Sequence, residues 1–162
     1  MLSKTVTALS VFFILVVFVT SAVIAGSNYE FKTKVDHRAS FWEKVSEKIN
    51  LFTKFNKVGK AKYWRELIDT RFAEIKYAVD GSRLGDIEDM TSRYSTYLGY
   101  YSEFLIKNNL SSEKEITLSM FGKHSEILKG LQQKYEFDSA WWMLIEHDIN
   151  TLVIFKDKIQ KL

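Results

Sequence analysis

Residues 60–79, KAKYWRELIDTRFAEIKYAV, contain the pattern that decides the fold. The large apolar side chains of this stretch recur three or four positions apart, at Trp64, Leu67, Ile68, Phe72, Ile75 and Val79. Because such positions share one face of an α-helix, the spacing predicts an amphipathic helix from about Lys60 to Val79. Asp80 and Gly81 follow and are expected to end it.

The same helical spacing of apolar residues occurs in the sequence before and after this helix. Ser40 and Glu43 have the spacing of a capping box and predict the start of a helix that ends before Gly59. The apolar positions of this helix are Phe41, Val45, Ile49 and Phe52. After Asp80, a third helix is capped by Ser82, ends at Asn108 and carries one apolar face: Leu84, Ile87, Thr91, Tyr94, Leu98, Tyr101 and Leu105.

Two further helices follow. Ser112 and Glu115 form a second capping box before a fourth helix. A fifth helix starts at Ser139. Lysines near its C-terminal end stabilise the negative end of the helix dipole. No segment alternates with a period of two for long enough to predict a strand, and the chain has no proline, which would interrupt helices. The fold class expected is all-α, an antiparallel bundle of about five helices over residues 40–162, preceded by a linker over residues 27–39.

Residues 1–26 have the character of a membrane segment. The 21 residues from Thr5 to Ala25 carry no charge and, as a helix, would span about 31 Å, close to the thickness of a bilayer core. This predicts an uncleaved signal anchor. A cleaved signal peptide is the alternative, with Lys4 before the apolar run and Val23 to Ala25 as the cleavage site.

The orientation follows from two opposing signals. Lys32, Lys34 and Arg38 follow the segment closely, so a count of positive charges favours a cytoplasmic C-terminal domain. The signal-like layout favours the opposite, and large domains cross the membrane largely regardless of charge. We expect a single-pass membrane protein whose C-terminal domain is extracytoplasmic.

Composition excludes several classes of function. The 162 residues include no cysteine, which excludes a disulfide scaffold, a thiolate metal site and a cysteine nucleophile. A net charge of +3 is too balanced for a dedicated nucleic-acid-binding domain. Phosphate-binding glycine loops and a nucleophile elbow are absent from the sequence. We therefore expect no enzyme activity, no cofactor and no nucleic-acid partner.

Two of the histidines are candidate metal ligands. His124 and His147 would face each other if the fourth and fifth helices pair, with Glu146 or Asp148 nearby. Neither has the Glu-x-x-His spacing of a di-iron bundle, which favours the alternative of surface or flanking histidines.

Six residues are candidates for an interaction surface. Lys54, Lys57, Lys60 and Lys62 form a basic run with interleaved aromatic residues, which suits anionic lipid headgroups or an acidic polymer; a solvated helix end is the alternative. On the third helix, Tyr94, Tyr97 and Tyr101 can face the core, which leaves Tyr100 outside. Trp141 and Trp142 diverge in the same way, so Trp142 is a candidate partner contact.

Residues Phe41 to Leu105 resemble a bacterial domain of unknown function that follows a single N-terminal membrane segment, seen in candidate-phylum bacteria among others. The resembling stretches are Phe41 to Lys44, Lys60 to Tyr63, Leu67 to Glu74 and Ser92 to Thr96. The resemblance implies an envelope-facing helical domain and no activity. Within it, Arg71 and Glu74 are three residues apart and form either a buried or a surface ion pair.

Together these features favour a non-enzymatic, membrane-anchored domain that mediates protein–protein interaction, or self-association, in the cell envelope. The alternative is a ligand-binding or sensory domain that holds an apolar small molecule or lipid between its helices.

Overall fold

The computed structural model describes residues 29–162, which form five α-helices, one short 3-10 turn and no strand. The elements are α2 (Phe41–Thr53), α3 (Lys57–Asp80), α4 (Leu84–Lys107), η1 (Ser111–Glu113), α5 (Lys114–Gln132) and α6 (Ala140–Ile159). The all-α class is confirmed. The predicted membrane segment, residues 1–26, lies outside the described residues. Within residues 29–162, no helix combines the length and the apolar content that a membrane crossing needs.

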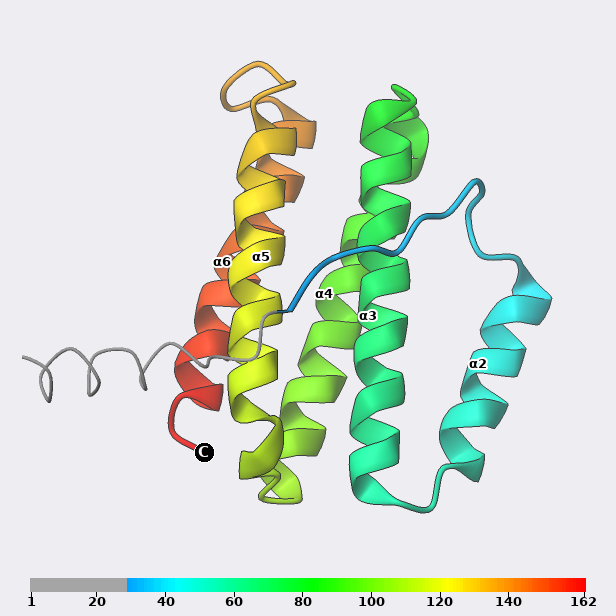
Figure 1. Ribbon diagram of the computed structural model, residues 1–162. Helices are drawn as coiled ribbons and strands as arrows, with labels where there is room; N and C mark the ends of the chain where they lie inside the picture. The colour runs from blue at the N-terminus through cyan, green and yellow to red at the C-terminus, as the bar shows by residue number, and fades with distance from the viewer. Residues whose placement is uncertain (1–28) are drawn as a thin grey trace, which may run out of the picture.

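Helices α3 to α6 form a four-helix bundle, and α2 stands beside it (Figure 1). The most extensive packing joins α3 to α4, α4 to α6 and α5 to α6. Figure 1 shows α3 and α5 running one way and α4 and α6 the other. Antiparallel packing is therefore present within the pairs α3–α4 and α5–α6, whereas α4 and α6 are neighbours that run in the same direction.

The core is built from the apolar stripes of these four helices. All but one of the six positions that defined the stripe of α3 are buried, and Trp64 packs against the core from its edge. Ile87, Tyr94, Leu98, Tyr101 and Leu105 of α4 are completely buried. The helical period predicted these faces correctly except at Leu84, which is exposed, because each helix buries one stripe against its neighbours.

The first described residues do not form a separate linker. Tyr29 and Phe31 pack against the core, and residues 29–35 alternate between half-buried and exposed side chains. This extended strap crosses the bundle over α5 and α3 (Figure 1). The alternation is present in the sequence Tyr-Glu-Phe-Lys-Thr-Lys-Val, residues 29–35, which lie within the predicted linker of residues 27–39.

The helix boundaries test the capping predictions. The capping box of Ser40 and Glu43 is present, and Ser139 caps α6. The box predicted at Ser112 is wrong, because residues 111–113 form the 3-10 turn and α5 begins without a side-chain cap. Ser82 does not cap α4. The first helix ends before Gly59, as predicted, but Gly59 is not its stop, since Asn56 caps α3 and places Gly59 in the first turn of α3.

Helix α2 differs most from its predicted role in the bundle. It contains no buried residue, and Phe41, Ile49 and Phe52 of its apolar stripe are exposed. Figure 1 shows α2 apart from the other helices. Four helices, rather than five, therefore enclose the core.

Candidate functional site

The outer face of α2 is an apolar surface that the bundle does not cover. At about 100° per residue, Phe41, Trp42, Val45, Ile49 and Phe52 lie within an arc of about 100°. All of them except the half-buried Val45 are exposed, and Phe52 retains 82% of its accessible surface. An arc of this width is what an amphipathic helix normally turns toward a core. Here it faces away from the only core that the described residues form.

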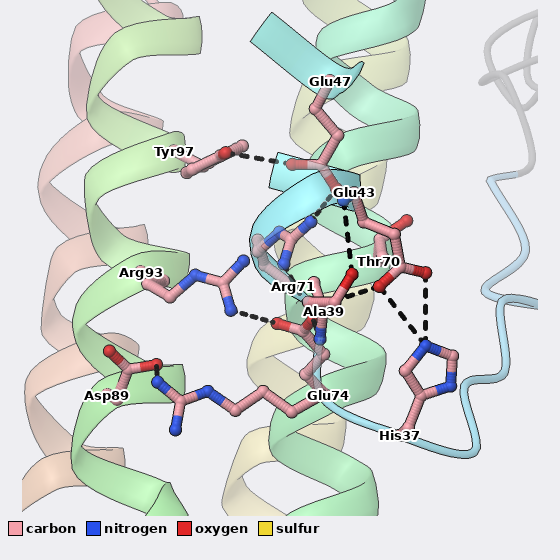
Figure 2. Close-up of polar contacts among 12 residues, drawn as sticks. His37, Ala39, Glu43, Glu47, Thr70, Arg71, Glu74, Asp89, Arg93 and Tyr97 are labelled. Carbon is pink, nitrogen blue, oxygen red and sulfur yellow. Dashed lines mark hydrogen bonds and ion pairs between the residues drawn. The ribbon is translucent and has the colours of Figure 1, made fainter. Parts of the chain in front are cut away.

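The opposite side of α2 is fixed by a buried ion pair (Figure 2). Arg71 of α3 has no exposed side-chain surface, and its guanidinium donates to Glu47 of α2. The same guanidinium donates to Glu74 across 2.7 Å. The sequence left the Arg71–Glu74 pair open between a buried and a surface location, and it is buried.

Helix α4 and the residue just before the N-cap of α2 complete this buried cluster. Arg93 lies 3.2 Å from the second carboxylate oxygen of Glu74, and the Tyr97 hydroxyl donates to Glu47. The backbone N–H of Ala39 donates to Glu74 across 2.9 Å, which fixes the chain just before α2 begins. Two carboxylates and two guanidinium groups balance in charge, as buried ions require.

The electrostatics reflect competition between burial and pairing. Burial raises the pKa of Glu47, and the positive charge of Arg71 opposes this shift. Burial beside the Glu47 carboxylate also raises the pKa of Tyr97 to about 12. The Tyr97 hydroxyl therefore stays protonated and remains a donor to Glu47 at neutral pH.

The N-terminus of α2 is held by a separate set of exposed contacts. The backbone N–H of Ser40 donates to the Glu43 carboxylate across 2.7 Å. Hydrogen bonds with Ser40 and His37 lower the pKa of Glu43 to about 2. His37 contacts Asp36 and Glu43, and these hydrogen bonds raise its pKa. Arg38 reaches Asp89 of α4 across 2.6 Å. The start of α2 is thus fixed both by contacts with neighbouring residues in the sequence and by an ion pair with the bundle.

A second polar cluster surrounds His124 in the core. The imidazole of this completely buried residue stacks on Phe72 at 3.9 Å between ring centroids. Its Nδ1 lies 2.9 Å from the Tyr94 hydroxyl, and its Nε2 lies 3.0 Å from the Tyr29 hydroxyl and 3.3 Å from Asp69. Tyr29 donates to Asp69 across 2.5 Å, which leaves its oxygen free to accept from Nε2–H. This arrangement suits a neutral imidazole that accepts from Tyr94.

The predicted roles of the histidines are corrected by this geometry. Burial lowers the pKa of His124, and Asp69 opposes the shift. The interpretation of His124 as a surface or flanking residue is wrong, whereas the side chain of His147 is 70% exposed. Among residues 29–162, no group of three or more His, Cys, Asp or Glu side chains is placed to hold a metal ion. His124 acts instead as the centre of a hydrogen-bonded contact between the strap, α3, α4 and α5.

The six predicted interaction residues do not form one surface. Lys54, Lys57 and Lys62 are exposed near the corner between α2 and α3, and Lys60 is half-buried over the ring of Phe104. Tyr100 is exposed beside Trp64. Trp142 lies at the start of α6 and packs on Phe137, at the opposite end of the bundle from the α2–α3 corner (Figure 1).

The sequence did not reveal the residues that hold α2. Glu47 and Arg93 lie 24 residues before and 22 residues after Arg71, and no local spacing connects them. The exposed side of α2 was also missed, because its period is that of any core helix. The available signal was Arg71 itself, a charge placed directly beside the apolar stripe position Phe72.

Comparison of the chain with protein-family models, with curated proteins and with solved structures finds no match. The resemblance of residues 41–105 to an envelope domain family therefore stays a prediction.

Proposed function

We propose that this chain is a non-enzymatic, membrane-anchored domain that binds a partner protein through the outer face of α2. The observation that carries this proposal is the exposure of four large apolar side chains on one face of a helix whose other side is fixed by buried ion pairs. Contiguous exposed apolar surfaces of this kind mark interaction sites. A face held rigid before binding also loses less conformational entropy when it binds.

The charges beside this face favour a particular kind of partner. Glu43 and Glu47 turn toward His37 and Arg71, so the carboxylates of α2 are engaged on its inner side. Lys48 and Lys54 remain exposed. An amphipathic helix that carries apolar residues flanked by Asp and Glu would complement both the apolar arc and these lysines. A second copy of α2 would instead bring like charges together.

The proposed location complements this role. With residues 5–25 in the membrane, the domain would stand on the extracytoplasmic side, with α2 about 15 residues beyond the anchor. The partner would then be a protein of the cell envelope. The proposal includes no catalytic residue, and it treats the Arg71 and His124 clusters as structural, because their side chains pair with one another in ion pairs and hydrogen bonds.

Site-specific photo-crosslinking in native membranes tests the proposal. A photoreactive amino acid replaces Phe52 in the full chain, and a control places it at Ile154, another exposed apolar position, on α6. We expect the Phe52 position to crosslink reproducibly to an amphipathic helix that carries Asp or Glu. Ile49→Asp and Lys48→Glu should each reduce that product several-fold, whereas Val153→Asp should not.

Three outcomes would contradict the proposal. Crosslinks only to lipid would show that α2 lies on the membrane surface. Crosslinks only to a second copy would show self-association. Equal yields from Phe52 and Ile154, insensitive to Ile49→Asp, would show that the face of α2 has no specific partner.

A further inference from the structure

A groove separates the strap from the last turns of α3. It has a volume of about 630 Å³, within the range of ligand-binding pockets. Residues 31–35 form one wall, and residues 73–83 of α3 and its C-terminal turn form the other. The groove does not share any residue with the outer face of α2, so it is independent of the proposed protein-binding surface.

The walls of the groove are apolar at the base and basic at the edge. Phe31, Val35, Ala73 and Tyr77 supply apolar surface. Phe31 is anchored edge-on against Phe72 at 4.9 Å between ring centroids, so this wall is continuous with the core. Apolar area of this kind favours an aliphatic chain over water.

Four cations and one carboxylate line the same groove. The cations are Lys32, Lys34, Lys76 and Arg83, and the carboxylate is Asp80, which gives a formal charge of +3. Asp80 is already paired, with Lys76 and with Lys134. The guanidinium of Arg83 lies 4.5 Å from the centre of the Tyr77 ring, which positions its charge above an apolar wall. Lys32 is paired with Glu30, whereas Lys34 is exposed and forms no ion pair within residues 29–162.

We propose that this groove binds a single-chain anionic amphiphile, with the acyl chain against Phe31, Val35, Ala73 and Tyr77 and the anionic head at Lys34 and Arg83. A carboxylate or phosphate head would find charge-assisted donors at the edge. The acyl chain would be removed from water at the base. An amphiphile with a neutral head would gain only the burial of its acyl chain and not the charge-assisted contacts. The ligand class is therefore a fatty acid or a lysophospholipid, which share an acyl chain and an anion.

Binding to the full chain tests this proposal. A diazirine-bearing long-chain fatty acid is used below its micelle-forming concentration, and labelled residues are mapped by mass spectrometry. We expect saturable labelling of residues 31–35 and 73–83. Unlabelled fatty acid and lysophosphatidylglycerol compete in separate arms, which distinguishes a carboxylate from a phosphate source. A fatty alcohol of equal chain length should compete about tenfold more weakly, as expected for the loss of a charge-assisted contact.

Variants connect the labelling to the groove. Lys34→Glu and Arg83→Glu should each weaken binding about tenfold. Thr33→Trp should obstruct the groove and abolish saturable labelling. The matched control Lys62→Glu reverses an exposed charge elsewhere and should leave binding unchanged. Circular dichroism verifies that each variant folds.

Several results would overturn the proposal. Labelling that does not saturate, that maps outside the groove, or that is unaffected by both charge reversals would do so. Equal competition by the fatty alcohol would remove the role of the basic edge. Crosslinking of the groove to residues 5–25 of the same chain, without displacement by fatty acid, would assign the groove to the protein itself. These results leave the α2 crosslinking experiment unaffected.

Discussion

The guanidinium of Arg71 joins two carboxylates, those of Glu47 in α2 and Glu74 in its own helix, and no part of the Arg71 side chain reaches solvent. This relationship explains how α2 stays in place without burying an apolar residue. Ion pairs that replace apolar packing hold the inner side, so the apolar side chains remain on the outer side. Because one cation serves both acids, the positioning of α2 depends strongly on Arg71.

Substitution of Arg71 should therefore destabilise the whole domain. Arg71→Met leaves Glu47 and Glu74 buried without their shared cation, which costs about 3–5 kcal/mol in comparable buried pairs. Urea unfolding of the full chain measures this change in the free energy of unfolding. The exposed control Lys62→Met should change it by less than about 0.5 kcal/mol. A cost for Arg71→Met no larger than that of the control would show that the buried cluster is unimportant.

Glu47→Gln should act locally rather than globally. It removes the carboxylate that α2 contributes, while Arg71 keeps Glu74 as a partner. Helix α2 should then detach more often, and trypsin should cleave faster after Lys54 and Lys57. The bundle should retain its unfolding midpoint within a few degrees. Unchanged cleavage would mean that α2 is held by other contacts.

Stability should fall as the pH rises through the range in which Asp148 titrates. Both carboxylate oxygens of this completely buried residue lack a hydrogen-bond partner within the described chain, and burial raises its pKa to about 8. The folded state then binds a proton that the unfolded state has released, so the free energy of unfolding falls between about pH 4 and pH 8, by at most about 1.4 kcal/mol per pH unit.

His124 should produce the opposite slope at lower pH. Burial lowers its pKa, so the unfolded state takes up a proton first as the pH falls below about 6.5, and stability is lost there. Below about pH 6.5 the opposing slopes of Asp148 and His124 offset each other in the wild type, so Asp148→Asn should remove the decline above pH 6.5 and reveal a loss of stability at acidic pH. Urea unfolding between pH 4.5 and 8.5 provides the measurement. If wild type and Asp148→Asn give parallel curves, Asp148 does not titrate as its burial indicates.

Two glycines of α5 should be replaceable with a gain in stability. A methyl group added at Gly122 or Gly130 meets no atom within 4 Å, and alanine is the better helix former by about 0.5–1 kcal/mol at each position. Gly81→Ala is the contrasting variant, because its Cβ would lie 3.1 Å from the backbone oxygen of Tyr77. Thermal unfolding should show a higher midpoint for the α5 variants alone.

Ser139 and Ser112, both predicted at helix starts, should differ in their contribution to stability. Ser139→Ala removes the hydroxyl that accepts from the Trp142 N–H and should cost about 1 kcal/mol. Ser112→Ala should cost almost nothing, because residue 112 belongs to the 3-10 turn and its capping box is absent. A clear loss at Ser112 would contradict the observed start of α5.

The His124 cluster shows where prediction from the sequence failed. The helical period correctly assigned Phe72 and Tyr94 to the core, but the missing Glu-x-x-His spacing favoured a surface or flanking position for His124. In the fold, three polar partners from three other segments, Tyr29, Asp69 and Tyr94, make its burial possible. Such compensation is not visible until segments up to 95 residues apart meet.

The sequence by itself determined the helices of this protein, the stripes of α3 and α4, and the caps at Ser40 and Ser139. These features depend on residues within a few positions of one another, so the helical period and local hydrogen bonds are sufficient to specify them. Only the tertiary structure decided that the apolar face of α2 points outward, that Arg71 joins α2 to the bundle, and that the strap forms a groove with α3. Each of these depends on which surfaces remain after the stripes of α3 to α6 have buried one another, and that competition involves the whole chain.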